Sequence, residues 1–358
     1  MTVHPVHVNA DLLQAFTQRV FAAVGLPDED ARQVAENLIH ADLRGHAAHG
    51  VTRIQIYTER VKRGVVSARP DIKVERTAPT VALVDGDNGS GAVVGNVATR
   101  EAIALAKESG VGIGVVRRSN HNGPCSYFAM QALPHGFIGF SATNPPLSMA
   151  VWGSRGRGLG TNPFAVAIPA GRHPALVVDM SSSVVARGKV VEAAKRGESI
   201  PEGWALDPDG NPTTDAKAGE AGVVLPFAGP KGSAIAVLVD VFSGVLSGAA
   251  FGALVNNLYA DFTNPQDNGH FVAAIDVSRF MAASDFGDRM DQMIDMLKAA
   301  PKAKGFDEIL MPGEPELRKE EELRRTGILL PPNVVAEIRE VSDPLGIPFP
   351  ESSDRPLA

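Results

Sequence analysis

The segment from Val111 to Gly123 constrains the fold of this chain more than any other part of the sequence. Its first half, Val111 to Val116, is a short apolar run of β-branched residues and glycines, which predicts a buried strand. The polar group Arg118 to Gly123 follows directly. Ligands of α/β sheets bind beyond the carboxyl ends of the strands, so His121 is a candidate acid or base. A histidine that only hydrogen-bonds within a tight turn would give the same pattern.

A second polar cluster, Ala41 to Arg53, lies between two helical patterns. The apolar residues before it repeat every three to four positions, which predicts a helix that ends near Arg44. His49 and Arg53 are four residues apart and can project from one face of the next helix. Such a pair suits an anionic substrate, because a guanidinium pairs with a carboxylate and an imidazole can exchange a proton. A solvated junction with ordinary ion pairs is the alternative.

Further short motifs follow these two segments along the chain. The complete series, in order, is Asp42 to Arg53, Ser119-Asn120-His121, Gly160-Thr161-Asn162-Pro163, Asp179-Met180, Pro230-Lys231-Gly232 and Met311-Pro312-Gly313-Glu314. From about Leu12 to about Ile338, the series resembles the type-2 malate/L-lactate dehydrogenase family, which is distinct from the Rossmann-type enzymes. The resemblance implies an α/β, non-Rossmann fold of mixed sheets, with a helical domain built from both termini. It also implies a homodimer.

The resemblance further implies a division of the chain into domains. The implied parts are a helical domain (1–76 with about 300–345), a cofactor-binding domain (77–120 with 231–299), an inserted sheet domain (121–230) and a tail (346–358). Within them, each motif position takes the role that its counterpart has in the family.

These roles divide into substrate and cofactor residues. His121 is the predicted acid or base, and His49 positions the reacting oxygen. Arg53, together with Arg44, clamps the carboxylate, and Thr161 lines the pocket. The implied cofactor residues are Asp179, Met180, Ser181, Lys231, Pro312, Gly313 and Glu314.

The composition agrees with a globular enzyme and argues against other classes of protein. With 358 residues and 44% hydrophobic content, the chain can bury a large core. A net charge of -7, without a basic stripe, argues against a nucleic-acid partner. The sequence has no signal-peptide pattern and no apolar run long enough to span a membrane. The single cysteine, Cys125, excludes an intramolecular disulfide, so we expect a cytoplasmic protein.

Two other chemistries begin from residues near the candidate site. Cys125 lies four residues after His121, which invites the hypothesis of a nucleophilic thiol. A small buried thiol is the better interpretation, since spacing alone does not bring the two side chains together. His46 and His49 would begin a metal site, but three or four ligands are required and the sequence supplies no such set. We therefore expect no metal.

A glycine-rich segment, Gly89 to Gly95, imitates a dinucleotide-binding turn between the strand-like run Val81 to Asp85 and a helix. The polar loop Gly86 to Gly89 separates the two, whereas that fingerprint needs a tight turn entered directly. We therefore expect the cofactor elsewhere. A second glycine-rich stretch, Met149 to Pro163, predicts a loop whose exposed amides can bind anionic groups.

Periodicity predicts the remaining elements. They are helices over about 9–63 with Asn9 as a cap, short strands between about 80 and 180, an irregular segment at 190–229, a buried helix pair at 233–254, a strand at 270–275, a helix at 285–298 and a solvated helix at 314–325. No internal repeat is visible.

Together these features predict an oxidoreductase that transfers a hydride between NAD or NADP, with NAD preferred, and a small 2-hydroxy or 2-oxo carboxylate. A reductase of a cyclic imino acid is the alternative within the family. A catalytically silent binding protein is the alternative from another class. Ala48 and Pro145 stand where the family usually has serine. An imine forms no alkoxide, so the missing hydroxyl at Ala48 favours the imine alternative, and the exact substrate stays open.

Overall fold

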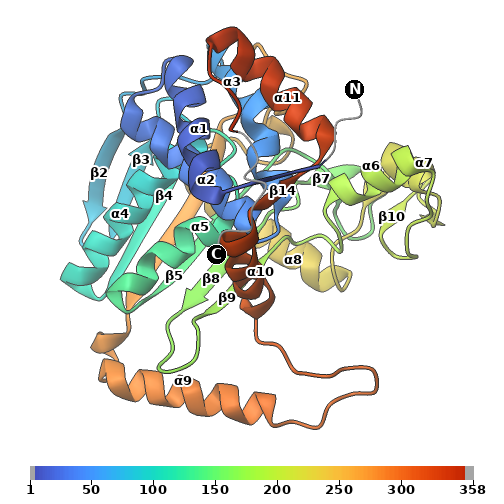
Figure 1. The fold of residues 1–358 in the computed structure, drawn as a ribbon. Helices are drawn as coiled ribbons and strands as arrows, with labels where there is room; N and C mark the ends of the chain where they lie inside the picture. Colours follow the sequence, from blue (N-terminus) through green and yellow to red (C-terminus); the bar gives the residue numbers. More distant parts are fainter. Residues whose placement is uncertain (1–4, 351–358) are drawn as a thin grey trace.

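The computed structural model describes residues 5–350, which form a mixed α/β fold with three sheets of different size (Figure 1). A seven-stranded sheet is the largest, a two-stranded sheet joins the two ends of the chain, and a five-stranded sheet belongs to a smaller unit at one side. None of the described helices combines the length and the apolarity needed to cross a membrane.

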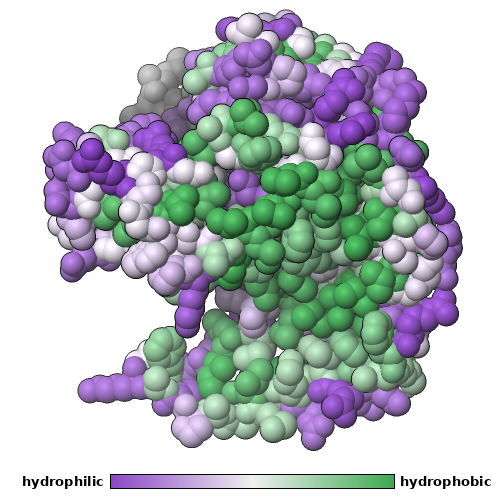
Figure 2. Space-filling model, turned by 180° about the vertical axis from the view of Figure 1, so that it is seen from behind, coloured by the Kyte–Doolittle hydropathy of each residue, from purple (hydrophilic) through white to green (hydrophobic). Residues whose placement is uncertain are grey.

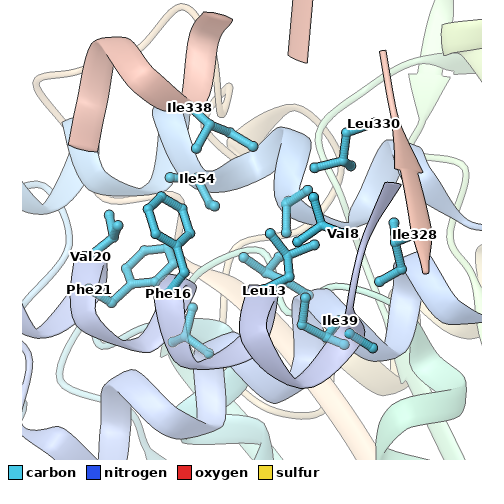
Figure 3. Close-up of a cluster of buried hydrophobic side chains, with 14 of the residues drawn as sticks. Val8, Leu13, Phe16, Val20, Phe21, Ile39, Ile54, Ile328, Leu330 and Ile338 are labelled. Carbon is cyan, nitrogen blue, oxygen red and sulfur yellow. The ribbon is translucent and has the colours of Figure 1, made fainter. Parts of the chain in front are cut away.

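The helical unit is built from both ends of the chain. Its elements are β1 (Val6–Val8), α1 (Ala10–Ala23), α2 (Asp28–Leu43), α3 (Ile54–Lys62), α10 (Glu314–Thr326), β14 (Ile328–Leu330) and α11 (Pro332–Ser342). Asn9 caps α1 as predicted, because its side chain accepts hydrogen bonds from the N–H groups of Asp11 and Leu12. β1 pairs antiparallel with β14, and apolar side chains from both chain ends pack in one buried cluster (Figure 3).

This cluster extends into the segment predicted as a tail. Phe349 is only 9% exposed and packs edge-on against Phe16, with the ring centroids 5.5 Å apart. Residues 346–350 therefore belong to the packed unit. Residues 351–358, the rest of the predicted tail, lie outside the described residues.

The seven-stranded sheet is mixed. Its strands, in spatial order, are β2 (Lys73–Ala78), β3 (Val81–Asp85), β4 (Val111–Ser119), β13 (Asn268–Asp276), β5 (Phe137–Thr143), β8 (Phe164–Ile168) and β9 (Leu176–Met180). β3 and β4 are parallel and are joined by α4 (Gly91–Ser109), whereas the other neighbouring pairs are antiparallel. A Rossmann sheet is mostly parallel, so the predicted non-Rossmann fold is confirmed.

The glycine-rich segment before α4 has a packing role. A Cβ on Gly91 would lie 2.1 Å from the carbonyl oxygen of Asn120. The backbone that leads to His121 therefore covers the first residue of α4. This close approach accounts for a glycine at the start of the helix without a bound nucleotide.

The seven-stranded sheet contains strands from two of the implied domains. β13 pairs with β4 on one side and with β5 on the other. Strands from the cofactor-binding part (77–120 with 231–299) and from the inserted part (121–230) therefore lie in one sheet. The helices α4 and α5 (Cys125–Ala129) lie side by side over it (Figure 1).

The smaller unit holds the five-stranded sheet. Its elements are β6 (Met149–Ala150), β7 (Arg157–Leu159), α6 (Arg187–Arg196), β10 (Ala205–Leu206), β11 (Pro212–Thr213), α7 (Ala216–Ala221) and β12 (Val223–Val224). The predicted loop at 149–163 and the predicted irregular segment at 190–229 are therefore wrong in part. Strands of two or three residues are too short to produce a periodic signal.

Residues 233–254 do not form the predicted buried helix pair. α8 (Pro230–Asp240) runs into a single π-helical turn, Val241–Val245, and then into an irregular segment. From α8 to the irregular segment, several large apolar side chains are exposed. This surface, called the α8 apolar face, consists of Val237, Leu238, Val241, Val245, Leu246, Phe251 and Leu254. The side of the molecule opposite to the view of Figure 1 has a broad hydrophobic area (Figure 2). Hydropathy alone does not distinguish such a surface from a core.

The range predicted as short strands, about 80–180, also contains the helices α4 and α5, while the other predictions of secondary structure are confirmed. The strand expected at 270–275 lies within β13, and the helix expected at 285–298 lies within α9 (Ala283–Lys298). The charged helix expected at 314–325 is α10, with Leu323 as its buried residue.

Candidate functional site

The loop between α2 and α3 folds back over a buried carboxylate. Asp42 is 4% exposed and accepts a hydrogen bond from the N–H of Val51 (2.8 Å). A Cβ on Gly50 would lie 1.9 Å from Asp42 Oδ1, so the close approach requires glycine. Burial raises the pKa of Asp42 to about 7. These contacts hold the loop that carries His49 and Arg53.

Two histidines from distant parts of the sequence stack in this site. The rings of His49 and His121 are nearly parallel, at 6°, with centroids 5.5 Å apart. His121 follows the end of β4, as the sequence predicts. Its N–H donates to Gln266 Oε1 (3.1 Å), which precedes β13. The structure therefore brings the two predicted polar segments together.

Tyr57 on α3 contacts the second histidine. Its hydroxyl lies 2.5 Å from His121 Nδ1 and can donate to this nitrogen or accept from it. The backbone nitrogen of Gly123 also lies 3.3 Å from Nδ1. The protein thus engages Nδ1, which leaves Nε2 for a ligand.

Sequence reasoning missed Tyr57 as a site residue. The signal was present, because Tyr57 lies four residues after Arg53, at the spacing that puts two side chains on one helical face. Gln266 carried no such signal. It reaches His121 only through the tertiary fold.

The cluster combines positive charge with burial. Burial, together with His49, Arg53 and His270, lowers the pKa of His121 well below its usual value. Burial, Arg53 and His46 lower the pKa of His49 to about 4. Both rings are therefore neutral at pH 7, whereas the guanidinium of Arg53 stays charged.

Several buried polar atoms of the cluster have no hydrogen-bond partner within residues 5–350. They include His49 Nδ1, Arg53 Nε and Asn120 Oδ1. A buried polar group without a partner costs about 1–3 kcal/mol. A polar ligand that hydrogen-bonds to these atoms would remove the cost, so the arrangement favours a small molecule with an anionic group.

Two predicted substrate residues make contacts with other parts of the chain. The buried guanidinium of Arg44 pairs with Glu320 of α10 (3.4 Å), so Arg44 joins α2 to α10 and its position does not support a part in the clamp. Thr161 lies between β7 and β8, and its carbonyl accepts a hydrogen bond from the N–H of Ser182 (2.7 Å). In the described part of the chain, no hydrogen bond links the Thr161 side chain to the histidines.

Within the described residues, the structure supports neither a nucleophilic Cys125 nor a metal site. Cys125 is buried, and its thiol lies 3.6 Å from the carbonyl oxygen of Pro163. Burial, with Asp179 nearby, raises the pKa of Cys125 well above its usual value, so the thiol stays protonated. Across residues 5–350, no three His, Cys, Asp or Glu side chains are grouped to hold a metal ion.

The predicted cofactor residues gather at the end of β9. Asp179 accepts a hydrogen bond from the N–H of Ser126 (3.1 Å), at the start of α5. The carbonyl of Pro312 accepts one from the N–H of Val177 (3.0 Å). Gly313 has a φ of +92°, and a Cβ there would lie 2.9 Å from Val177 Cβ. The Pro-Gly-Glu turn thus packs on β9 beside Asp179.

A backbone hydrogen bond links the segment after β9 to the loop that leads to Lys231. The carbonyl of Ser182, next to Ser181, accepts a hydrogen bond from the N–H of Phe227 (3.1 Å). Lys231 follows four residues later and is exposed in the first turn of α8. An exposed lysine at a helix N-terminus suits the phosphates of a dinucleotide, so these residues fit the implied cofactor.

The other predicted cofactor residues differ in whether their side chains are already bonded to other residues. Met180 is 37% exposed at the end of β9. The Ser181 hydroxyl lies 3.0 Å from that of Ser183. Glu314 pairs with Lys298 (2.7 Å). Glu314 therefore stabilises its own turn, while Met180 is available to a ligand.

The chain matches known proteins over nearly its whole length. The profile of the malate/L-lactate dehydrogenase family matches residues 8–339. Malate dehydrogenase of Pyrococcus horikoshii is 38% identical over 350 residues, which cover 96% of this chain and 96% of that protein. L-sulfolactate dehydrogenase of Methanocaldococcus jannaschii is 37% identical over 331 residues (92% and 94%). Ureidoglycolate dehydrogenase (NAD(+)) of Escherichia coli is 35% identical over 321 residues (90% and 91%).

Solved structures agree with these matches. The sulfolactate dehydrogenase of Methanocaldococcus jannaschii superposes with a TM-score of 0.90 at 35% identity, covering 96% of this chain and 98% of that one. Delta1-piperideine-2-carboxylate reductase of Pseudomonas syringae superposes with a TM-score of 0.83 at 26% identity, covering 94% and 99%. The same fold therefore serves both a dehydrogenase and a reductase.

Proposed function

Because the chain belongs to the malate/L-lactate dehydrogenase family, as its motifs predicted, we propose a reaction for the site described above. The protein is an oxidoreductase that uses a nicotinamide cofactor and acts on a small 2-hydroxy or 2-oxo carboxylate. The observation that carries the proposal is the stacked pair of His49 and His121 beside Arg53. In this cluster, His49 Nδ1 and Arg53 Nε are buried without hydrogen-bond partners in the described chain.

Each residue of the cluster has one task in the proposed reaction. Arg53 binds the carboxylate, His49 positions the oxygen on C2, and His121 exchanges a proton with that oxygen at Nε2. In oxidation, Nε2 accepts the hydroxyl proton as hydride leaves C2, and in reduction the protonated ring returns it to the 2-oxo oxygen. Nδ1 carries its hydrogen both before and after this transfer, so the Tyr57 hydroxyl accepts from Nδ1 in both states and holds the tautomer that leaves Nε2 free. The nicotinamide supplies or accepts the hydride.

The substrate itself adjusts the charge of this site. Arg53 is one cause of the low pKa of His121. A carboxylate bound to Arg53 offsets the positive charge, and the pKa of His121 then rises toward its usual value. Binding of the anionic substrate thus makes protonation of His121 easier, which the reductive direction requires.

For the cofactor, the proposal keeps the predicted residues and prefers NAD. Lys231 would bind the phosphates, while Asp179, Met180, Ser181 and the Pro312–Glu314 turn contact the rest of the dinucleotide. The names of the relatives include one NAD(+) enzyme and one NADP(+) enzyme, so the preference for NAD is a proposal for binding measurements to test. Fluorescence titration with NADH and NADPH tests it, and tighter binding of NADPH would contradict it.

A reductase of a cyclic imino acid is the second candidate. One observation favours it, namely the alanine at position 48, since a C=N substrate forms no alkoxide that needs a serine hydroxyl. The similarity to delta1-piperideine-2-carboxylate reductase agrees with this candidate. The imine is reduced at the same cluster, with the carboxylate again on Arg53.

A homodimer in the cytoplasm completes the proposal. The α8 apolar face exposes more large apolar side chains than a helix in contact with water usually does. A second copy of the chain would bury them. Sedimentation of the purified protein tests the dimer. Location in the cytoplasm rests on the single cysteine, which the reducing cytosol keeps as a thiol.

One assay distinguishes the candidates. The purified protein is mixed with NADH or NADPH and a panel of 2-oxo acids and cyclic imino acids, and oxidation of the cofactor is followed. Turnover of 2-oxo acids supports the dehydrogenase, and turnover of the imines alone supports the second candidate. A protein that binds cofactor but oxidises it with none of these compounds is a silent binding protein.

A further inference from the structure

A pocket of about 560 Å³ opens beside Arg53, between α3, α11 and the loop before β13. Its main lining residues are Ala48, Arg53, Glu59, Tyr259, Phe262 and Glu337. This volume lies within the roughly 300–1,000 Å³ that is typical of small-molecule pockets, so there is room for more of the substrate than the carboxylate. Because Arg53 belongs both to the pocket and to the histidine cluster, a substrate held by its carboxylate at Arg53 can extend into the pocket.

Tyr259 lines the pocket beside Arg53, the residue proposed to bind the carboxylate. The guanidinium carbon of Arg53 lies 5.3 Å from the centroid of the Tyr259 ring, a cation–π contact. The ring is 56% exposed, so one part of it is free to contact a ligand. The stack orients a guanidinium whose Nε is buried and without a partner in the described chain.

The loop that carries Tyr259 is held in place from α3. Arg60, which is 1% exposed, donates hydrogen bonds to the carbonyls of Leu258 (3.1 Å) and Asp261 (2.5 Å). Arg63 lies over the Phe262 ring, 4.4 Å from its centroid. The loop is therefore a fixed wall rather than a mobile cover.

The charges of the pocket discriminate between substrates. Arg53 is the only cationic side chain among its described lining residues, and in the proposed reaction the substrate carboxylate occupies it. Glu59 is paired with Arg63 (2.5 Å), but Glu337 has no cation to balance it among the described ion pairs. A second anionic group on the substrate would face Glu337 with no cation beside it.

The geometry points to a substrate class: a 2-oxo or 2-hydroxy acid with one carboxylate and an extended, uncharged side chain that packs against Tyr259. This inference rests on the proposed function and narrows it. Tyr259 determines specificity and positions Arg53. Ala48 agrees with this assignment, because a methyl group keeps its side of the pocket apolar where a hydroxyl would not.

A substrate panel gives the first test. The wild type is assayed with phenylpyruvate, 2-oxohexanoate and oxaloacetate at saturating reduced cofactor. We expect kcat/KM for the two extended monocarboxylates to exceed that for oxaloacetate by about tenfold or more. A preference for oxaloacetate would overturn the inference and leave the proposed function intact. If no 2-oxo acid is reduced, the proposed function fails with it.

Two variants of the wall test the role of Tyr259. Tyr259→Ala should raise KM for the extended substrates by about tenfold, through loss of the stack and of the wall, with the cofactor Kd unchanged. Tyr259→Phe keeps the ring and should behave as the wild type. Equal losses of substrate and cofactor affinity in Tyr259→Ala would contradict a role in specificity.

A charge reversal tests the role of Glu337 against a matched control. Glu337→Lys supplies the missing cation and should raise kcat/KM for oxaloacetate relative to 2-oxohexanoate by about tenfold. Glu321→Lys makes the same change of charge at an exposed position of α10, outside the pocket lining. If the two variants change the ratio of substrates equally, the pocket does not receive the distal end of the substrate.

Discussion

The substrate half of the proposed site brings two imidazoles, a guanidinium and a phenol into contact and leaves several of their buried atoms without partners. In the cofactor half, by contrast, Asp179, Ser181 and Glu314 already bond to other residues of the chain, and Met180 and Lys231 are exposed. The first half carries an electrostatic cost that a ligand would remove. The second is a stable platform, suited to a large ligand that makes many weak contacts.

This difference predicts which substitutions affect chemistry and which affect cofactor binding. Changes in the substrate half should lower turnover or substrate affinity and leave the cofactor Kd alone. Changes in the cofactor half should do the reverse.

Replacement of the proton-exchanging group is expected to have the largest effect. His121→Ala should lower kcat by about 10²- to 10⁴-fold, the range for a lost general acid or base, with an unchanged cofactor Kd. Steady-state kinetics and fluorescence titration measure the two quantities. His135→Ala, at an exposed histidine, is the control. Turnover within a few-fold of the wild type would make His121 a structural turn residue.

The carboxylate clamp is tested by a change that keeps its charge. Arg53→Lys loses the planar fork and should raise the substrate KM by about 10- to 100-fold, with little effect on the cofactor Kd. Arg339→Lys is the matched control, because Arg339 also lies over an aromatic ring, that of Phe349, and neither residue lines the pocket. Equal losses for substrate and cofactor would place Arg53 in the cofactor half.

Acid should destabilise the fold beneath the substrate half. His270 is fully buried between the hydroxyls of Ser119 (2.8 Å) and Thr143 (2.7 Å), and burial lowers its pKa to about 3. Below pH 6.5 the unfolded chain protonates this ring while the folded chain does not, so the unfolded state binds more protons and stability falls as the pH falls. Between pH 7 and pH 5 the loss is about 2 kcal/mol for this group.

Denaturant unfolding at several pH values measures this loss. His270→Gln should lose about 2 kcal/mol less than the wild type between pH 7 and pH 5. Glu314→Gln in the cofactor half should keep the wild-type slope over this range. The same pH dependence in His270→Gln and in the wild type would mean that His270 is not the source.

The smallest effect is expected in the cofactor half. Gly313→Ala places a Cβ against Val177 at a φ of +92°, which should shift the turn and raise the cofactor Kd by about tenfold, with kcat unchanged at saturating cofactor. Gly346→Ala has a similar positive φ but no atom within 4 Å of the added Cβ, so it controls for backbone strain. An unchanged cofactor Kd would remove the Pro-Gly-Glu turn from the cofactor half.

Much of the fold was predictable because its signals are local. Asn9 as a cap, the strand before His121 and the helix at 314–325 all follow from periodicity or from single side chains. The order of the short motifs was enough to identify the family. The small strands at 149–224 were not predictable, because two or three residues carry no periodicity.

The sequence by itself determined the family, the positive strand-end cluster and the residue types at its two polar segments. Only the tertiary structure decided which of them meet. Tyr57 and His121 are 64 residues apart and touch because α3 packs over the end of β4, while Arg44 lies in the same motif as Arg53 and faces α10 instead. The structure also placed the apolar residues of 233–254 on the surface. Local patterns report backbone geometry and hydropathy, but contact between distant segments depends on how whole elements pack.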